Sequence, residues 1–314
     1  MLGCASVLLQ TNASFAPVNL SLFSSESPTT DVEFSIISTG DIGLVRDINY
    51  KIVLSKNPNY PFLKIADYLK SADLTIANLE GPLINNCPIS REGFTFCGED
   101  ENVSGLVFAG IDGVNLANNH STNYGLEGLS ETVQVLRSNN IIPFGLDGQI
   151  EYVDIKGKKA ALVGFVELGN SWEGLSNATE ENVSALVSQA RQNADIVITS
   201  FHWGVEYTYK PSENQIKLAH LAIDNGSDIV LGNHPHWIQP IEVYSDKIIV
   251  YAQGNTVFDQ DWSQETREGV LYKFVWRNGR FEKIEEKYTI IEENSQPRFA
   301  TEKEVLKIKQ KISL

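Results

Sequence analysis

Four of the five histidines in this 314-residue chain lie in short polar motifs that directly follow apolar runs. The motifs are Leu116-Ala-Asn-Asn-His120, Ser200-Phe-His-Trp-Gly204 and Gly232-Asn-His-Pro-His236. A fourth motif, Ser38-Thr-Gly-Asp41, follows another β-rich run and adds a carboxylate. An α/β fold brings such residues from successive strand ends to one edge of a sheet, where carboxylate and imidazole groups can bind a metal ion. The pattern therefore predicts metal-assisted chemistry.

The composition is that of a protein with a substantial core, because 42% of the residues are hydrophobic. The length allows one large domain or two smaller ones. A formal net charge of −15 opposes a general nucleic-acid binder, which needs clustered Lys and Arg. No apolar run reaches the roughly 18 residues of a transmembrane helix, so no membrane span is predicted.

The first residues, Met1-Leu-Gly-Cys4, are similar to the end of a bacterial lipoprotein signal, with Cys4 as the lipid acceptor. The alternative is an imprecise start of the chain that carries no signal. Residues 10–30 are rich in Ser, Thr, Asn and Pro, so we interpret residues 1–30 as a flexible N-terminal tether. The lipoprotein interpretation predicts an extracytoplasmic protein anchored to a membrane through Cys4.

Two further cysteines, Cys87 and Cys97, lie in a stretch with the Gly and Pro content of a loop. A disulfide between them would close a short loop and contribute about 2–3 kcal/mol to stability. The alternative is a pair of free buried thiols. A disulfide would agree with an extracytoplasmic location, because such bonds persist in oxidising compartments.

Strand and helix patterns alternate along most of the chain and give way to strands near the end, which is typical of a layered α/β sandwich. We assign residues 31–295 to one domain and residues 296–314 to a C-terminal helical tail. The expected strands are 33–39, 73–77, 113–117, 195–200, 228–231, 241–243, 248–251, 270–276 and 281–291, with a hairpin over 152–166 that turns at Gly157. The expected helices are 62–70, 103–109, 126–139, 181–192, 214–225 and 302–311.

Asn78-Leu-Glu80 also follows a predicted strand. Side chains two residues apart on an extended segment point the same way, so Asn78 and Glu80 can face one site. Glu80 could then hold one cation or bridge two. The alternative is a polar surface turn before Pro82.

The remaining motifs supply complementary chemistry. An Asn oxygen such as that of Asn119 can serve as a neutral metal ligand, and His120 beside it can protonate a leaving group. Glu206, four residues after His202, can orient an imidazole or contact substrate, although it could equally be a solvated carboxylate. His234 and His236 form a tight pair that can place two imidazoles on one side of an extended segment.

In order and spacing, these motifs resemble the CapA family of poly-γ-glutamate capsule proteins, within the calcineurin-like metallophosphoesterase superfamily. The resemblance runs from about residue 36 to about residue 260. It rests on Thr39-Gly-Asp-Ile42, Ala77-Asn-Leu-Glu-Gly-Pro82, Leu116-Ala-Asn-Asn-His120 with Tyr124-Gly125, His202-Trp-Gly-Val-Glu-Tyr207, Gly232-Asn-His-Pro-His236 with Gln239-Pro240, and Gly254-Asn255 with Val257-Phe-Asp-Gln260.

The resemblance implies a four-layer α/β/β/α sandwich with metal ions at the strand ends. By position, the implied metal ligands are Asp41, Glu80, Asn119, His202, His234 and His236, with His120 acting near the leaving group. Ordinary members of the superfamily carry a His two residues after the first Asp, where this chain has Gly43, and they use Asp in the second motif. Asn123 and Asn233 stand where CapA-like chains usually have Asp and often have His, respectively.

Two functions are compatible with these residues. The first is a metal-dependent hydrolase or transferase, of phosphoesterase type, with one or two Mn, Fe, Zn or Mg ions. The resemblance implies an acidic polymer or its precursor as substrate and capsule-assembly membrane proteins as partners. The second is a non-enzymatic surface accessory protein that binds polymer or assembly partners and keeps a vestigial metal site. The departure at Gly43 favours the second function, and the retained acid, amide and imidazole groups favour the first.

Overall fold

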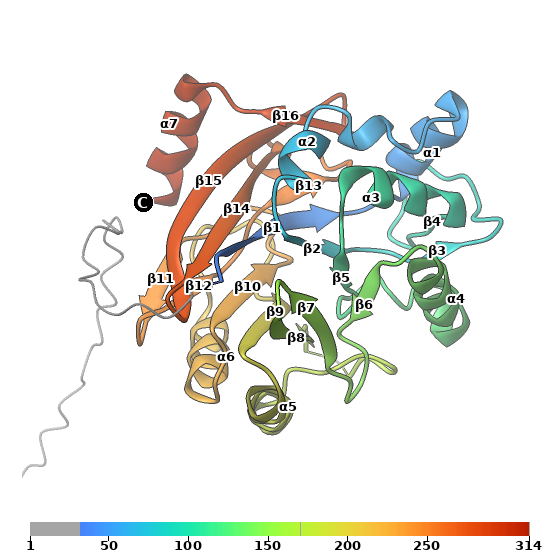
Figure 1. Ribbon diagram of the computed structural model, residues 1–314. Helices are drawn as coiled ribbons and strands as arrows, with labels where there is room; N and C mark the ends of the chain where they lie inside the picture. Colours follow the sequence, from blue (N-terminus) through green and yellow to red (C-terminus); the bar gives the residue numbers. More distant parts are fainter. Residues whose placement is uncertain (1–31, 170, 314) are drawn as a thin grey trace, which may run out of the picture.

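The computed structural model describes residues 32–169 and 171–313, and it contains two large β-sheets packed face to face (Figure 1). The first sheet has eight strands in the order β16-β15-β14-β1-β2-β5-β6, with β13 paired to β1. Its parallel part consists of β1 (Phe34–Ile42), β2 (Leu74–Leu79), β5 (Gly113–Asn115), β6 (Ile142–Phe144) and β13 (Asn255–Val257). Its antiparallel part consists of β14 (Glu268–Arg277), β15 (Arg280–Glu292) and β16 (Gln296–Phe299).

The second sheet has six strands in the order β11-β12-β10-β9-β8-β7. Its central strands β8 (Lys158–Glu167), β9 (Ile196–Trp203), β10 (Ile229–Asn233) and β12 (Lys247–Val250) are parallel. The edge strands β7 (Glu151–Ile155) and β11 (Ile241–Tyr244) are antiparallel to their neighbours. A small pair, β3 (Leu83–Ile84) and β4 (Gly98–Glu99), lies apart from both large sheets.

Helices cover the outer face of each sheet. Buried side chains of α1 (Arg46–Ser55), α2 (Ala66–Leu69), α3 (Val103–Ala109) and α4 (Gly125–Ser138) pack against the first sheet. Those of α5 (Glu180–Asn193) and α6 (Glu213–Asp224) pack against the second. The remaining helix, α7 (Glu302–Ile312), buries Ile308 in the core between the sheets.

Neighbouring strand residues contribute to different cores, because successive side chains of a strand point to opposite faces. Ile36 packs between the two sheets, whereas Ile37 packs under the helices of the first sheet. In the second sheet, Leu162 faces the space between the sheets and Val163 faces α5 and α6. Three separate cores therefore divide four layers, which confirms the predicted α/β/β/α sandwich.

Most of the predicted elements are present, but the helix predicted over residues 62–70 is wrong in its extent. The chain instead forms a 3₁₀ turn, Tyr60–Phe62, followed by the short helix α2. The sequence interpretation also missed α1 and the strands β3, β4, β6, β13 and β16, which are short or lack a clear apolar period. The domain boundary at residue 295 stays a prediction, although β16 extends the first sheet beyond it by pairing with β15.

Replacing Phe274 by alanine should remove a large, fully buried side chain from between the sheets. We expect a loss of about 3–5 kcal/mol in the free energy of unfolding, from the lost transfer free energy and the cavity left behind. Leu306→Ala, on the exposed side of α7, should change it by no more than about 0.5 kcal/mol. Urea denaturation of both variants measures the difference, and equal effects would contradict the assignment of this core.

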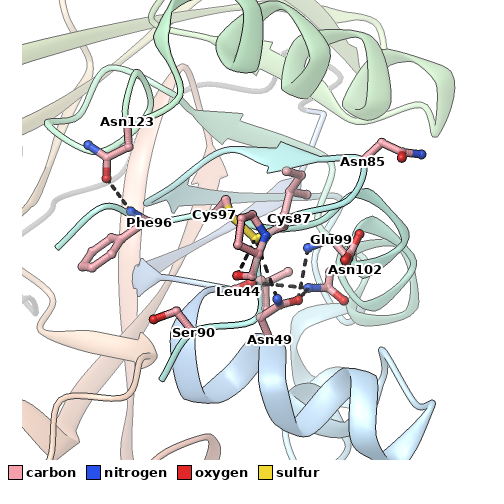
Figure 2. Close-up of a disulfide and its surroundings, with 12 residues drawn as sticks. Leu44, Asn49, Asn85, Cys87, Ser90, Phe96, Cys97, Glu99, Asn102 and Asn123 are labelled. Carbon is pink, nitrogen blue, oxygen red and sulfur yellow. Dashed lines mark hydrogen bonds between the residues drawn. A yellow bond between two sulfur atoms is a disulfide. The ribbon is translucent and has the colours of Figure 1, made fainter. Parts of the chain in front are cut away.

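Cys87 and Cys97 are bonded to each other, with their Cα atoms 5.9 Å apart (Figure 2). This pairing agrees with the disulfide predicted from the sequence. Cys4 and the predicted tether lie outside the described residues. None of the helices in the described part of the chain is long and apolar enough to span a membrane.

Peptide mapping without reductant should recover the fragments containing Cys87 and Cys97 as one linked species. Replacement of both cysteines by serine should lower stability by about 2–3 kcal/mol, as the entropy of a short closed loop predicts. Chemical denaturation measures this loss. Two separately alkylated thiols in the untreated protein would show that the bond does not form.

Candidate metal centre

The predicted site residues meet where parallel strands of both sheets end. Asp41 is in β1 and Glu80 follows β2 directly, so both come from the first sheet. His202 is near the end of β9, and His234 follows β10, so these two come from the second sheet. The carboxyl ends of parallel strands are the usual place for a functional site in α/β folds.

The backbone around Asp41 requires glycine. The Asp41 N–H donates to the carbonyl oxygen of Gly254 over 3.0 Å, and Asp41 is in register with Asn255 of β13. A Cβ atom on Gly40 would lie only 2.0 Å from that same carbonyl oxygen. Gly40 therefore allows β1 and β13 to approach closely and fixes Asp41 at the end of the strand.

His234 and His236 both adopt the left-handed backbone conformation, with φ angles of 96° and 57°. A non-glycine residue in this region costs about 1–3 kcal/mol and persists only where its surroundings hold it. The His234 N–H donates to Asp41 Oδ2 over 3.3 Å, and the Pro235 carbonyl accepts from the Tyr207 N–H over 2.9 Å. These contacts hold a strained turn that aims both imidazoles at the site.

Two groups of three possible ligand atoms are close enough to hold metal ions. One group combines Asp41, Glu80 and His202, and the other combines Glu206, His234 and His236. Within each group the ligand atoms lie within 4.8 Å of one another. The groups adjoin, because His236 Nδ1 lies 3.3 Å from Asp41 Oδ2 and His236 Nε2 lies 3.8 Å from Glu80 Oε1.

Asn119 and His120 come from the loop after β5 and complete the site. Asn119 Oδ1 is 2.9 Å from His202 Nε2, and His120 Nε2 is 3.8 Å from Glu80 Oε1. The structure therefore brings together all eight residues singled out in the sequence: Asp41, Glu80, Asn119, His120, His202, Glu206, His234 and His236. Their individual roles stay predictions.

Several buried polar atoms of the site have no hydrogen-bond partner within the described part of the chain. They are both carboxylate oxygens of Glu80, Nδ1 of His202 and Nδ1 of His234. Buried polar groups normally find a partner, because an unpaired one costs about 1–3 kcal/mol. Carboxylate oxygens and imidazole nitrogens that converge without partners fit a divalent cation of the Mn, Fe, Zn type.

Amide side chains hold the charged groups in place. The Asn78 amide donates to Asp41 Oδ1 over 2.8 Å, and Asn118 in turn donates to the Leu79 carbonyl over 2.8 Å. Asn255 Oδ1 lies 2.9 Å from His236 Nδ1, and the Asn255 amide donates to the Thr266 carbonyl over 2.8 Å. Such outer contacts orient ligands and tune a metal site.

Burial sets the protonation of the imidazoles. It lowers the pKa of His120 to about 4 and of His234 to about 3, and it holds the pKa of His202 well below its usual value. Burial alone would also lower the pKa of His236, but Glu80 and Asp41 outweigh it and raise this pKa to about 9. Burial raises the pKa of Glu80 to about 8, opposed by His236 and reinforced by Asp41. The candidate ligands His202 and His234 are therefore neutral at pH 7, the form that binds metal, whereas His236 and Glu80 would each give up a proton when an ion binds.

Phe258 fills the space beside Gly43. A Cβ atom on Gly43 would lie 2.9 Å from the Phe258 ring. This ring also lies beside His236, with centroids 5.1 Å apart. The chain therefore supplies no imidazole from position 43, and an aromatic ring borders the site there instead.

A buried amide pair, which the sequence did not reveal, supports the loop that carries Glu206. Gln215 donates to Gln239 Oε1 over 2.9 Å, and the Gln239 amide donates to the Thr208 carbonyl over 3.1 Å. Both glutamines are fully buried. Gln239-Pro240 is one of the motifs on which the family resemblance rests, and it was the one sequence signal that pointed to this buried amide pair.

The sequence profile described as "Bacterial capsule synthesis protein PGA_cap" matches residues 35–260. The chain belongs to this PGA_cap family. The matched range contains all eight residues of the candidate centre.

Curated relatives agree with this membership. The chain is 31% identical over 270 residues to "Capsule biosynthesis protein CapA" of Bacillus anthracis. This match covers 78% of the present chain and 64% of the relative. It is 30% identical over 272 residues to "PGA biosynthesis protein CapA" of Bacillus subtilis (strain 168). This match covers 81% of the present chain and 71% of the relative. A "Probable polyglutamine synthesis accessory protein" of Mycobacterium tuberculosis is 26% identical, over 71% of this chain and 66% of its own length. The chain thus spans slightly less than two thirds of the first relative.

Solved structures show the same fold at low sequence identity. A hypothetical protein from Thermus thermophilus superposes with a TM-score of 0.54 at 15% identity, over 81% of this chain and 98% of that chain. A novel phosphatase from Mycoplasma pneumoniae superposes with a TM-score of 0.54 at 13% identity, over 82% of this chain and 94% of that chain. The PGA_cap chain therefore shares its overall fold with both of these proteins.

Proposed function

We propose that this PGA_cap protein binds one or two divalent metal ions between its two sheets and hydrolyses or transfers a phosphoryl or acyl group during poly-γ-glutamate synthesis or processing. The observation that carries the metal site is a set of buried donor atoms on Glu80, His202 and His234 that have no hydrogen-bond partner among the residues the structure describes. A folded protein keeps such atoms unpaired at a cost, which a bound cation would remove.

The ligands would be Asp41, Glu80, Asn119, His202, His234 and His236. Glu206 adds a carboxylate to the His234–His236 group from the second sheet, so it could supply a ligand that position 43 lacks. A divalent ion held by these residues would polarise the scissile group and lower the pKa of bound water.

His120 would give a proton to the leaving group from Nε2, which first has to take one up because burial keeps the imidazole neutral at pH 7. Its Nδ1 lies 2.9 Å from Asn123 Oδ1, which accepts a hydrogen bond, so Nδ1 carries the proton and Nε2 is directed at the Glu80 side of the site. The loop backbone also holds His120, because Asn118 Oδ1 accepts from the His120 N–H over 3.1 Å. The imidazole is therefore oriented before substrate binds.

The substrate class comes from the relatives, whose names refer to capsule biosynthesis and PGA biosynthesis, and from the family resemblance of the sequence, which implies poly-γ-glutamate. We infer an acidic polymer or its activated precursor as substrate, with membrane proteins of capsule assembly as partners. An extracytoplasmic location, with a lipid at Cys4, agrees with a surface polymer and with the Cys87–Cys97 bond.

A non-enzymatic accessory function is the second candidate, and Gly43 favours it. The Phe258 ring occupies the space from which a further imidazole would reach the metal. The Mycobacterium tuberculosis relative is itself named a probable accessory protein. In this function the site would bind a metal for structure or for holding polymer, without turnover.

Metal content and activity together separate these functions. Elemental analysis of protein purified without chelator should find at least about one divalent ion per chain, and the loaded protein should cleave generic phosphomonoester, phosphodiester or γ-glutamyl substrates. Metal without turnover on any of them would favour the accessory function. A stoichiometry near zero that added Mn, Fe, Zn or Mg cannot raise would refute the metal site.

A further inference from the structure

Figure 2 shows the loop that the Cys87–Cys97 disulfide closes, and this loop lies beside the candidate centre because Phe96 stacks on His120. It leaves the small strand β3 and returns to β4, and residues 88–95 within it are exposed. Phe96 is different, because only 2% of it is exposed. The loop therefore projects into solvent except at the residue next to Cys97, which is held inside the protein.

Phe96 contacts His120 in two ways. Its ring stacks on the imidazole, with centroids 3.9 Å apart and planes 22° from parallel. Its backbone N–H donates over 2.7 Å to Asn123 Oδ1, the same oxygen that faces His120 Nδ1 (Figure 2). The end of this loop therefore covers one face of the imidazole and shares its hydrogen-bond partner.

Arg46 ties the loop to the start of α1. Its guanidinium carbon is 4.5 Å from the centre of the Phe96 ring, and its Nη1 donates to the Gly93 carbonyl over 3.2 Å. Arg46 is itself almost buried and forms an ion pair with Asp259. This contact holds the middle of the loop, whereas the bond to Cys87 holds the residue adjacent to Phe96.

We propose that Phe96 is a positioning residue for His120 and that the Cys87–Cys97 bond holds Phe96 in place, so that the oxidation state of this cysteine pair controls the placement of His120. Reduction by a dithiol would transfer two electrons and two protons to the pair, break the S–S bond and leave two thiols, while the dithiol becomes a disulfide. The inference deepens the proposed function, on which the role of His120 rests, but it concerns geometry that can be measured without turnover.

The experiment measures how fast diethylpyrocarbonate acylates His120, which reacts through its neutral imidazole. Mass spectrometry of peptides reports each histidine separately, and His220 on α6, far along the chain from the loop, serves as the internal reference. Phe96→Leu keeps a buried apolar side chain but removes the flat ring. In this variant His120 should react roughly three- to tenfold faster, as expected from the loss of one stacked ring pair.

Reduction of the wild-type protein should have the same effect, and the Cys87→Ser/Cys97→Ser variant should react fast with or without dithiol. Phe94→Leu is the matched control, because this ring lies in the same loop but is 75% exposed. It should leave the rate at His120 unchanged. Phe96→Tyr keeps the stacked ring, so His120 in this variant should react at the wild-type rate. If Phe96 only filled space in the core, this wild-type rate would not be expected.

Unchanged reactivity of His120 in folded Phe96→Leu would overturn the positioning role. Unchanged reactivity after verified reduction of the wild type would overturn the role of the disulfide, even if Phe96→Leu failed to fold. Acceleration of His220 together with His120 would indicate general unfolding and would also count against the proposal. A protein that shows the predicted changes but binds no metal and turns over no substrate would refute the proposed function alone.

Discussion

His120→Ala should slow turnover by roughly 10²–10⁴-fold while leaving the metal content unchanged, as expected for loss of a general acid. His120 contacts Glu80 only at 3.8 Å and is oriented by Asn123, so it is not needed to hold the ligands together. A substrate with a good leaving group should be affected less, because such a group departs with less protonation. Steady-state kinetics on a matched pair of phosphoesters measures this contrast.

His220→Ala is the control for this prediction. His220 is a histidine of the second sheet's outer helix, stacked on Tyr244 and paired with Glu242, and it has no place in the centre. Its replacement should leave turnover unchanged. Loss of metal in His120→Ala would show that His120 is a ligand, and equal slowing for good and poor leaving groups would argue against proton transfer.

His236→Ala should lose metal and activity together. His236 is fully buried, and its ring nitrogens lie near both Asp41 and Glu80, so no neighbouring side chain can replace it without rearrangement. In the wild type, free metal at one hundred times Kd should stabilise the fold by about 2.7 kcal/mol. The variant should gain far less from the same concentration.

Elemental analysis and thermal unfolding with and without metal measure this difference. His220→Ala again provides the control and should keep the wild-type response. A His236→Ala protein that retains the wild-type metal stoichiometry and the wild-type rise in Tm would remove His236 from the ligand set. The variant should also be less stable than the wild type in the absence of metal, because the deletion removes one of the partners of Asp41 and one of the partners of Asn255.

The sequence predicted site residues correctly where a polar residue occupies a defined position in a regular element, such as the end of a strand. Asp41 and His202 lie at strand ends, so an apolar run followed by a polar residue was enough to place them. The alternation of Ile36 and Ile37 between two cores likewise follows from the period of a strand. The candidate centre could therefore be assembled from local patterns before any coordinates were known.

Contacts between distant segments had no such local signal. Phe96 stacks on a ring that belongs to a different loop, the one after β5, and nothing in its own neighbourhood specifies that partner. The Gln215–Gln239 pair also joins a helix to a loop by buried amides, whose partners depend on packing. The short strand β13 forms because it can pair with the end of β1, beyond the residues of β1 that pair with β14, so its own sequence carries little propensity.

The division of the ligands between the sheets has a consequence for biosynthesis. Asp41, Glu80 and Asn119 belong to the first half of the chain, whereas His202, His234 and His236 are made later. Of the proposed ligands, a nascent chain that has completed only its first half holds the oxygen donors alone, and these offer a transition metal little affinity. The ion would therefore bind only after the second sheet has packed against the first. The bound metal would then stabilise a four-layer fold that has already formed.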